Sequence, residues 1–117
     1  MTGNQLLTNA CALFGELSPE NYQKAALPCL NAVLFELFEV NNHIRQSEGL
    51  EKQSGVAAVA SLEAELPTQP RLDGAMAWGL AAKLFIDERD AAGLSALFQQ
   101  YVNAANDADT GWARWLL

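Results

Sequence analysis

The sequence has few basic residues and few cysteines, and each shortage excludes a class of protein. Seven Lys and Arg residues stand against fourteen acids, which gives a net charge of −7. The bases are scattered along the chain, whereas nucleic-acid binding needs them clustered, so no sequence-specific nucleic-acid binding is expected. Cys11 and Cys29 both fall inside apolar helical patterns. This placement favours small buried side chains over a disulfide, because nothing else in the sequence indicates an oxidising compartment.

Long hydrophobic runs and targeting signals are also lacking. The longest apolar stretch runs from Ala75 to Ile86 and has 12 residues, whereas a helix that crosses a bilayer needs about 20. Met1 to Gln5 carry no basic residue, and no small-residue cleavage site follows an apolar segment. These are not the features of a signal peptide. We therefore expect neither membrane insertion nor secretion, but a cytoplasmic protein.

The sequence does contain enough apolar residues for a folded core. Half of its residues are apolar and 18% are charged, which is typical of a globular domain. A length of 117 residues fits one domain, covering residues 1–117. Apolar side chains recur at the i, i+3, i+4 and i+7 positions that mark amphipathic helices. The sequence thus predicts an all-α bundle of four to five helices, over residues 5–17, 19–27, 28–46, 72–88 and 91–106.

Several residues are expected to begin or end these helices. Gly15 marks the exit of the first helix, and Ser18 followed by Pro19 predicts the start of the next, with Ser18 as N-cap and Pro19 in the first helical position. Pro28 either kinks one long helix or separates two, and we expect two. Asp90 is the predicted N-cap of the last helix.

Residues 47–69 are predicted to form a long central loop. Gly, Ser and Pro punctuate this stretch, and connections of this length in a compact domain are often functional. Residues 56–59 (Val-Ala-Ala-Val) interrupt it with a short apolar segment. We expect this segment to be either extended and packed on the helices or a single helical turn.

The sequence offers no convincing catalytic, cofactor or metal site. Glu36, Glu39 and His43 share one helical face, but a di-iron bundle needs Glu-x-x-His pairs and the chain has a single His. We interpret these three residues as the solvated side of a helix. Gly74 and Gly79 have the spacing of a P-loop without its lysine. Each costs a helix about 1 kcal/mol relative to alanine, so they predict close approach by another helix instead. We expect a protein without catalysis or cofactor.

The apolar content exceeds what one small core needs. Twelve of the sixteen residues in 25–40 are apolar, so this helix is expected to be buried on several sides, by its own fold or by a neighbouring subunit. Residues 107–117 form an aromatic tail, although chain ends are normally polar. Its tryptophans either cap their own bundle or dock on another chain. The candidate interface residues are Trp112, Trp115, Leu116, Leu117, Phe35, Val40, Val56 and Val59.

Several segments resemble a known family. Residues 77–85 (Ala-Trp-Gly-Leu-Ala-Ala-Lys-Leu-Phe), the acidic turn 87–90 and residues 97–101 (Leu-Phe-Gln-Gln-Tyr) resemble the C-terminal helix pair of small head–tail connector (adaptor) proteins of tailed phages and prophages. Residues 61–67 resemble the segment that leads into this pair. Residues 2–7 and 41–45 are also similar to connector-like prophage proteins.

The resemblance implies a helical virion assembly protein that forms a ring under the portal, with DNA passing through the centre. Its partners would be further copies of itself, the portal and tail-completion proteins. It would lie in the host cytoplasm and later in the virion. The acidic surface would then repel DNA phosphates, and otherwise it serves only solubility. The rival interpretation is a small acidic helical module for protein–protein interaction or regulation.

Overall fold

Helices dominate the part of the chain that the structure describes. The structure is a computed structural model, which describes the backbone of residues 1–55, 58–85 and 90–114 and, within these ranges, side chains up to residue 109. Two 3-10 turns, η1 (Pro19–Tyr22) and η2 (Pro70–Leu72), precede α2 and α4. The helices are α1 (Gly3–Leu13), α2 (Gln23–Glu36), α3 (Phe38–Ser47), α4 (Asp73–Phe85) and α5 (Ala91–Arg114). The predicted all-α bundle with a long central loop is confirmed.

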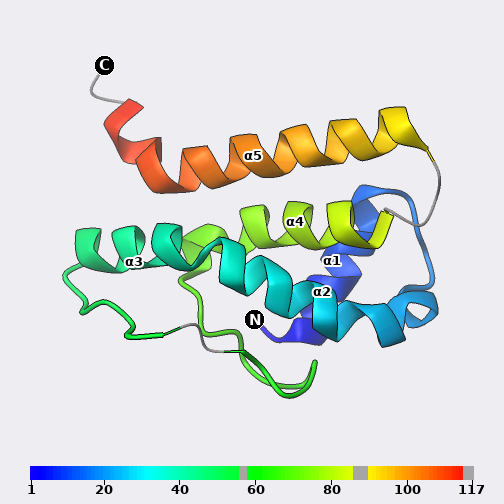
Figure 1. Cartoon of the computed structure of the whole chain (residues 1–117), viewed down its shortest axis with the longest axis horizontal. Helices are drawn as coiled ribbons and strands as arrows, with labels where there is room; N and C mark the ends of the chain where they lie inside the picture. The colour runs from blue at the N-terminus through cyan, green and yellow to red at the C-terminus, as the bar shows by residue number, and fades with distance from the viewer. Residues whose placement is uncertain (56–57, 86–89, 115–117) are drawn as a thin grey trace.

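α4 lies at the centre of this bundle. α5 runs along one side of it, and α1 and α2 pack on the other (Figure 1). Eight of the thirteen residues of α4 are buried, which leaves this helix no broad polar face and makes it the core element. The largest buried side chains around it include Leu6 and Leu7 of α1 and Leu30 of α2. Each such leucine contributes about 1.5–3 kcal/mol by leaving water.

α5 approaches α4 most closely where the ring of Tyr101 lies over Gly79. A Cβ atom at position 79 would lie 2.7 Å from Cε1 of Tyr101, well inside van der Waals contact. The predicted close approach at the two glycines of α4 is therefore confirmed for Gly79. It is wrong for Gly74, which is exposed in the first turn and whose Cβ position meets nothing within 4 Å.

α1 begins with a capping box that moves its start to Gly3, ahead of the predicted residue 5. The N–H of Gln5 donates to Oγ1 of Thr2 at 3.2 Å, and the N–H of Thr2 donates to Oε1 of Gln5 at 2.9 Å. These two bonds satisfy donors that a helix otherwise leaves unpaired at its N-terminus.

α1 ends at Leu13, four residues before the predicted end at residue 17. Gly15 forms a Schellman motif just after the helix, and it marks the helix exit as predicted. Gly15 has a φ of +78°, a left-handed conformation that glycine adopts without steric cost. The N–H of Glu16 then reaches back to the carbonyl of Cys11 at 2.9 Å. The chain leaves the helix here because this motif satisfies the last free carbonyls.

The other predicted start signals are right in two places and wrong in one. Pro19 occupies the first turn of η1, but the hydroxyl of Ser18 makes no capping bond. Instead, the N–H of Ser18 donates to Oε1 of Glu16 at 2.9 Å. Asp90 does cap α5, because its Oδ1 accepts the N–H of Gly93 at 2.9 Å.

Pro28 lies inside α2, so the predicted separation of two helices at this residue is wrong. The helix tolerates it because Pro28 is exposed, and the carbonyl that loses its helical partner, that of Lys24, sits in the exposed first turn where water can replace the missing donor. The break comes at Leu37 instead. Leu37 is buried and its N–H still donates to the carbonyl of Val33 at 2.9 Å. α3 therefore continues from α2 with a bend (Figure 1).

Side-chain amides of the helices hold the long loop between α3 and α4. Asn42 is buried; its Oδ1 accepts the N–H of Gln53 at 2.8 Å, and its Nδ2 donates to the Gln53 carbonyl at 3.2 Å. Asn31 makes the same pair of bonds with the backbone of Val59, at 2.9 and 3.1 Å. Each amide pairs with the N–H and C=O of one loop residue as a neighbouring strand would, so the backbone of Gln53 and Val59 is satisfied without secondary structure.

An extended contact does occur in this loop, at its far end. An isolated antiparallel bridge pairs Glu65 with Thr2, and the N–H of Asn4 donates to the carbonyl of Leu62 at 2.8 Å. Residues 58 and 59 are not helical, which excludes a helical turn there, and residues 56–57 lie outside the described chain. The loop is thus tied to both the N-terminal segment and α2.

α5 continues to Arg114, so the helix end predicted at residue 106 is wrong and most of the predicted tail 107–117 belongs to this helix. The reason is that its buried stripe extends through Leu97 and Tyr101 to Ala108. At 1.5 Å per residue, 24 helical residues span about 36 Å. This is close to the longest dimension of the molecule, 39 Å.

The Gly79 contact gives a test of how α5 is seated. Gly79→Ala should destabilise the fold by about 1–3 kcal/mol, because the added methyl group must displace the Tyr101 ring. Gly74→Ala is the matched control and should be neutral or stabilising by up to about 1 kcal/mol, because its methyl group meets open space. Urea unfolding of both variants measures the difference. Equal stabilities would contradict this packing.

Candidate functional site

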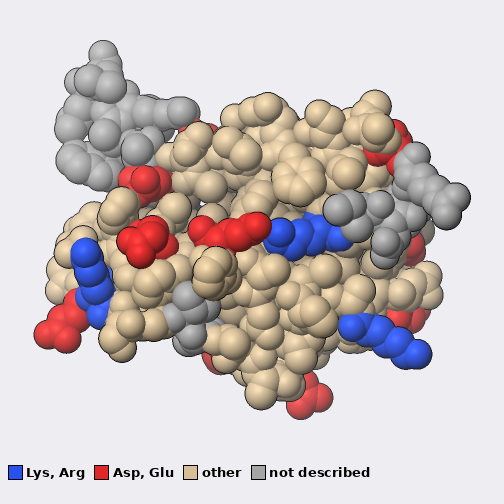
Figure 2. Space-filling view, viewed as in Figure 1, with Lys and Arg blue, Asp and Glu red and all other residues tan. Residues whose placement is uncertain are grey.

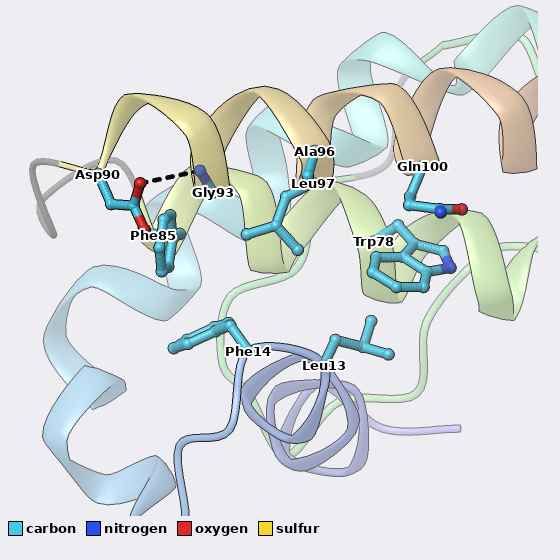
Figure 3. A pocket seen from close by; sticks show the side chains of 9 residues that line it. All are labelled: Leu13, Phe14, Trp78, Phe85, Asp90, Gly93, Ala96, Leu97 and Gln100. Atoms are coloured by element: carbon cyan, nitrogen blue, oxygen red, sulfur yellow. Dashed lines mark hydrogen bonds between the residues drawn. The ribbon is translucent and has the colours of Figure 1, made fainter.

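Two apolar grooves run beside α5, one on each side. The larger one, here called the aromatic groove, has a volume of about 480 Å³ and is formed by the end of α1, by α4 and by the first half of α5. Leu97 points into it from α5, with Phe14 and Phe85 on one side and Trp78 and Leu13 on the other (Figure 3).

The walls of the aromatic groove are fixed by ring contacts and by a helix cap. The rings of Phe14 and Phe85 meet edge to face, with centroids 5.7 Å apart, a geometry worth about 0.5–1.5 kcal/mol beyond the area buried. Asp90, which caps α5 through Gly93, closes one end of the groove. The Cβ position of Gly93 lies 2.9 Å from a ring carbon of Phe85, so the start of α5 is seated directly on this ring.

The second groove, here called the valine groove, lies between α5 and the bend that joins α2 to α3. Its volume is about 310 Å³, and Val40 and Val102 face it from opposite sides together with Phe98 and Leu37. Phe98 is 38% exposed and Val102 is 50% exposed. Large apolar side chains with this exposure, one turn apart on one helix and beside a groove, are typical of a surface that another chain covers.

The surface over the middle of α5 carries no charged side chain on the face that Figure 2 shows. A short row of acidic and basic groups crosses the same face next to α5, at the level of α3 and α4 (Figure 2). An uncharged strip bordered by charges is the usual layout of a protein-docking surface, with an apolar centre and a polar rim.

Glu36 connects three helices at the edge of the valine groove. Its Oε1 accepts the hydroxyl of Tyr101 at 2.8 Å, and its Oε2 accepts Nζ of Lys83 at 3.0 Å. α2, α4 and α5 are thereby joined by one carboxylate. Burial holds the pKa of the Tyr101 hydroxyl well above its ordinary value near 10, and the hydrogen bond to Glu36 adds to this effect.

The structure does not bring Glu36, Glu39 and His43 together into a catalytic or metal site. Glu36, Glu39 and His43 are all exposed, as predicted, but Glu36 pairs with α4 and α5, while Nδ1 of His43 lies 3.1 Å from Oδ1 of Asp109. Across the described ranges, no group of three His, Cys, Asp or Glu residues is placed to hold a metal ion. Burial raises the pKa of the Cys11 thiol, with a smaller effect from Glu16, and a protonated thiol is a poor nucleophile.

The candidate interface residues fall into three groups. Phe35, at 71% exposure, and Val40, in the valine groove, are at the surface of the bend region. Val59 is pinned to α2 by Asn31 and packs partly against the core. Trp112 lies on α5 with its side chain outside the described part, and the remaining candidates lie outside it altogether: Val56, Trp115, Leu116 and Leu117.

The apolar residues of α5 form a stripe wider than the face that packs on α4. Phe98 lies at the edge of this stripe and is partly exposed beside the valine groove. The sequence does contain a signal for an exposed apolar surface on this helix, which is the width of its apolar pattern. This pattern covers more of α5 than α4 alone can bury, and it consists of Leu94, Leu97, Phe98, Tyr101 and Val102.

No protein-family model, no curated protein and no solved structure matches the chain. Among the described helices, none is both long enough and apolar enough to cross a membrane. Function is therefore inferred from the two grooves and from the resemblance in the helix pair.

The Tyr101–Glu36 contact predicts a specific dependence of stability on pH. The folded protein keeps the Tyr101 proton above pH 10 whereas the unfolded chain releases it, so this residue's stabilising contribution is complete below pH 10. It then falls by about 1.4 kcal/mol per pH unit as the pH rises. Tyr101→Phe should lose about 1–2 kcal/mol at pH 7 through the missing hydrogen bond.

Urea unfolding of both proteins between pH 7 and 11.5 measures this effect. The gap between wild type and Tyr101→Phe should shrink above pH 10. A gap that stays constant over this range would show that Tyr101 ionises in the folded protein as it does in the unfolded chain.

Proposed function

We propose that the protein is a non-catalytic assembly subunit that docks on other protein chains through the valine groove. The observation that carries this proposal is the pair Phe98 and Val102, two large apolar side chains exposed beside a groove that is already formed. A preformed groove needs little rearrangement on binding, so less free energy is lost to ordering. The groove suits an apolar segment of another protein, because most of its lining is apolar and Glu36 and Asn106 lie among its polar residues.

We further propose that the assembly is the head–tail connector of a tailed phage or prophage, with the portal as docking partner. Support comes from the resemblance of the α4–α5 pair. A second support is that residues 2–7 and 61–67, both part of the resemblance, lie against each other through the Asn4–Leu62 hydrogen bond and the Thr2–Glu65 bridge. Portal, terminase and capsid genes beside this gene would agree with the proposal. A neighbourhood without them would favour a regulatory module.

The direct test is binding to the portal protein encoded by the same prophage. Phe98→Glu with Val102→Glu should abolish binding, because both substitutions place charges in the valine groove. Gln99→Glu with Asn103→Glu is the matched control: it adds the same two charges, one residue further along the same helix, at exposed positions outside the groove. Sedimentation with portal rings measures both variants, and circular dichroism checks that both are folded.

The proposal expects the control to bind portal like the wild type and the groove variant to lose binding at least about thirtyfold, the effect of removing a binding hot spot. A wild-type protein that ignores portal rings would exclude the connector. Equal binding by the two variants would exclude the valine groove as the docking site. A one-to-one complex with a different partner would favour the regulatory module.

A further inference from the structure

We propose that the aromatic groove receives the C-terminal segment 112–117 of a second copy of this chain. The segment contains Trp112, Arg114, Trp115, Leu116 and Leu117, so five of its six residues carry large side chains and four of these are apolar. This inference builds on the proposed function, since it supplies the contact between copies that an assembly needs. It uses a different groove from the one proposed for the portal.

The groove has the size and chemistry for such an occupant. Its volume of about 480 Å³ lies within the roughly 300–1,000 Å³ of pockets that bury sizeable ligands. Phe14, Phe85 and Trp78 offer ring faces and edges on its walls (Figure 3). Aromatic side chains pair well with such walls, and tryptophan is prominent among residues that anchor one protein in the pocket of another.

The charges of the groove and of segment 112–117 are opposite in sign. Asp90 carries the only charge among the described residues that line the groove. Arg114 carries the only side-chain charge in segment 112–117, and it lies between the two tryptophans. A chain with a net charge of −7 repels other copies of itself, so a contact between copies is best made where one side is neutral or basic. Segment 112–117 has no acidic side chain, whereas Asp107 and Asp109 stand just before it.

A chain cannot fill its own aromatic groove with this segment. The groove lies against the first half of α5 and reaches no further along it than Gln100. The helix continues to Arg114, 14 residues or about 21 Å beyond Gln100 at 1.5 Å per residue. Residues 115–117, even fully extended, span only about 10 Å. Asp109, near the C-terminal end of α5, contacts His43 of α3, at the opposite end of the molecule from the start of α5 (Figure 1).

The donor of the segment must therefore be another copy, and the contact is head to tail. One surface of each copy, the segment, meets a different surface of the next, the groove. Such contacts either close into a ring or extend into a filament, depending on the rotation between neighbours.

If the groove is blocked in one copy and the segment is removed from a second copy, a single contact between the two copies remains possible.

Two complementary full-length variants test this. Ala96→Glu blocks the groove with a charge at an exposed position that lines it, while its segment stays intact. Trp112→Ala with Trp115→Ala removes the segment's anchors, while its groove stays open. Ser95→Glu is the matched control for the first variant: it is exposed, adjacent on α5 and does not line the groove. Sedimentation velocity over a concentration series gives the oligomeric state of each protein and of their mixture.

The inference expects wild type and Ser95→Glu to associate beyond a dimer as concentration rises. Ala96→Glu alone and the double Trp variant alone should stay monomeric, with association at least about tenfold weaker, and their mixture should form one-to-one dimers. If the double Trp variant does not fold, the comparison of Ala96→Glu with Ser95→Glu still decides, because only the former should be monomeric.

A mixture that stays monomeric, a monomeric wild type, or an Ala96→Glu protein that associates like Ser95→Glu would each overturn the inference. These outcomes differ from failure of the proposed function. Portal binding with no head-to-tail dimer would reject only this inference, whereas head-to-tail dimers without portal binding would reject only the connector.

Discussion

The close approach of the Tyr101 ring to Gly79 sets the position of α5, and the two grooves beside α5 follow from it. Because position 79 has no Cβ, the ring lies directly on the backbone of α4. From there the hydroxyl reaches Glu36, which also holds Lys83. These contacts fix the distance between α5 and α4. The aromatic groove and the valine groove are the spaces left on either side of α5 at this distance.

The same arrangement explains why so much apolar surface is left at α5. α4 is rich in Gly and Ala and is already covered by α1 and α2 on its other side. A single helix on top of it can bury only a narrow stripe, here Leu97, Tyr101 and Ala108. Phe98 and Val102 flank this stripe and stay partly exposed. The apolar surplus of the composition is thus concentrated along one helix that spans nearly the whole molecule, which favours a role in docking.

Several local sequence signals predicted the structure correctly, whereas Ser18, Gly74 and Pro28 did not. Gly15, Asp90 and Gly79 each predicted a specific feature of the backbone: a helix end, a helix start and a close approach between helices. Thr2 and Gln5 also have the residue types and spacing of a capping box. The bend at Leu37 has no such signal, since neither glycine nor proline occurs there, and the proline at 28 misled because an exposed first turn can replace the lost bond with water. The buried Asn42 could not be foreseen, because its partner Gln53 comes from a loop whose path only the whole fold defines. The grooves depend in the same way on which helices become neighbours.

Hydrogen–deuterium exchange of the protein with and without portal rings tests the central claim, that the chain works by docking through the surface along α5. The account predicts slower exchange in peptides that cover residues 94–106 and 34–40, which line the valine groove, and unchanged exchange in residues 48–55 of the loop. Slower exchange confined to the loop, or no change along α5 despite binding, would contradict it.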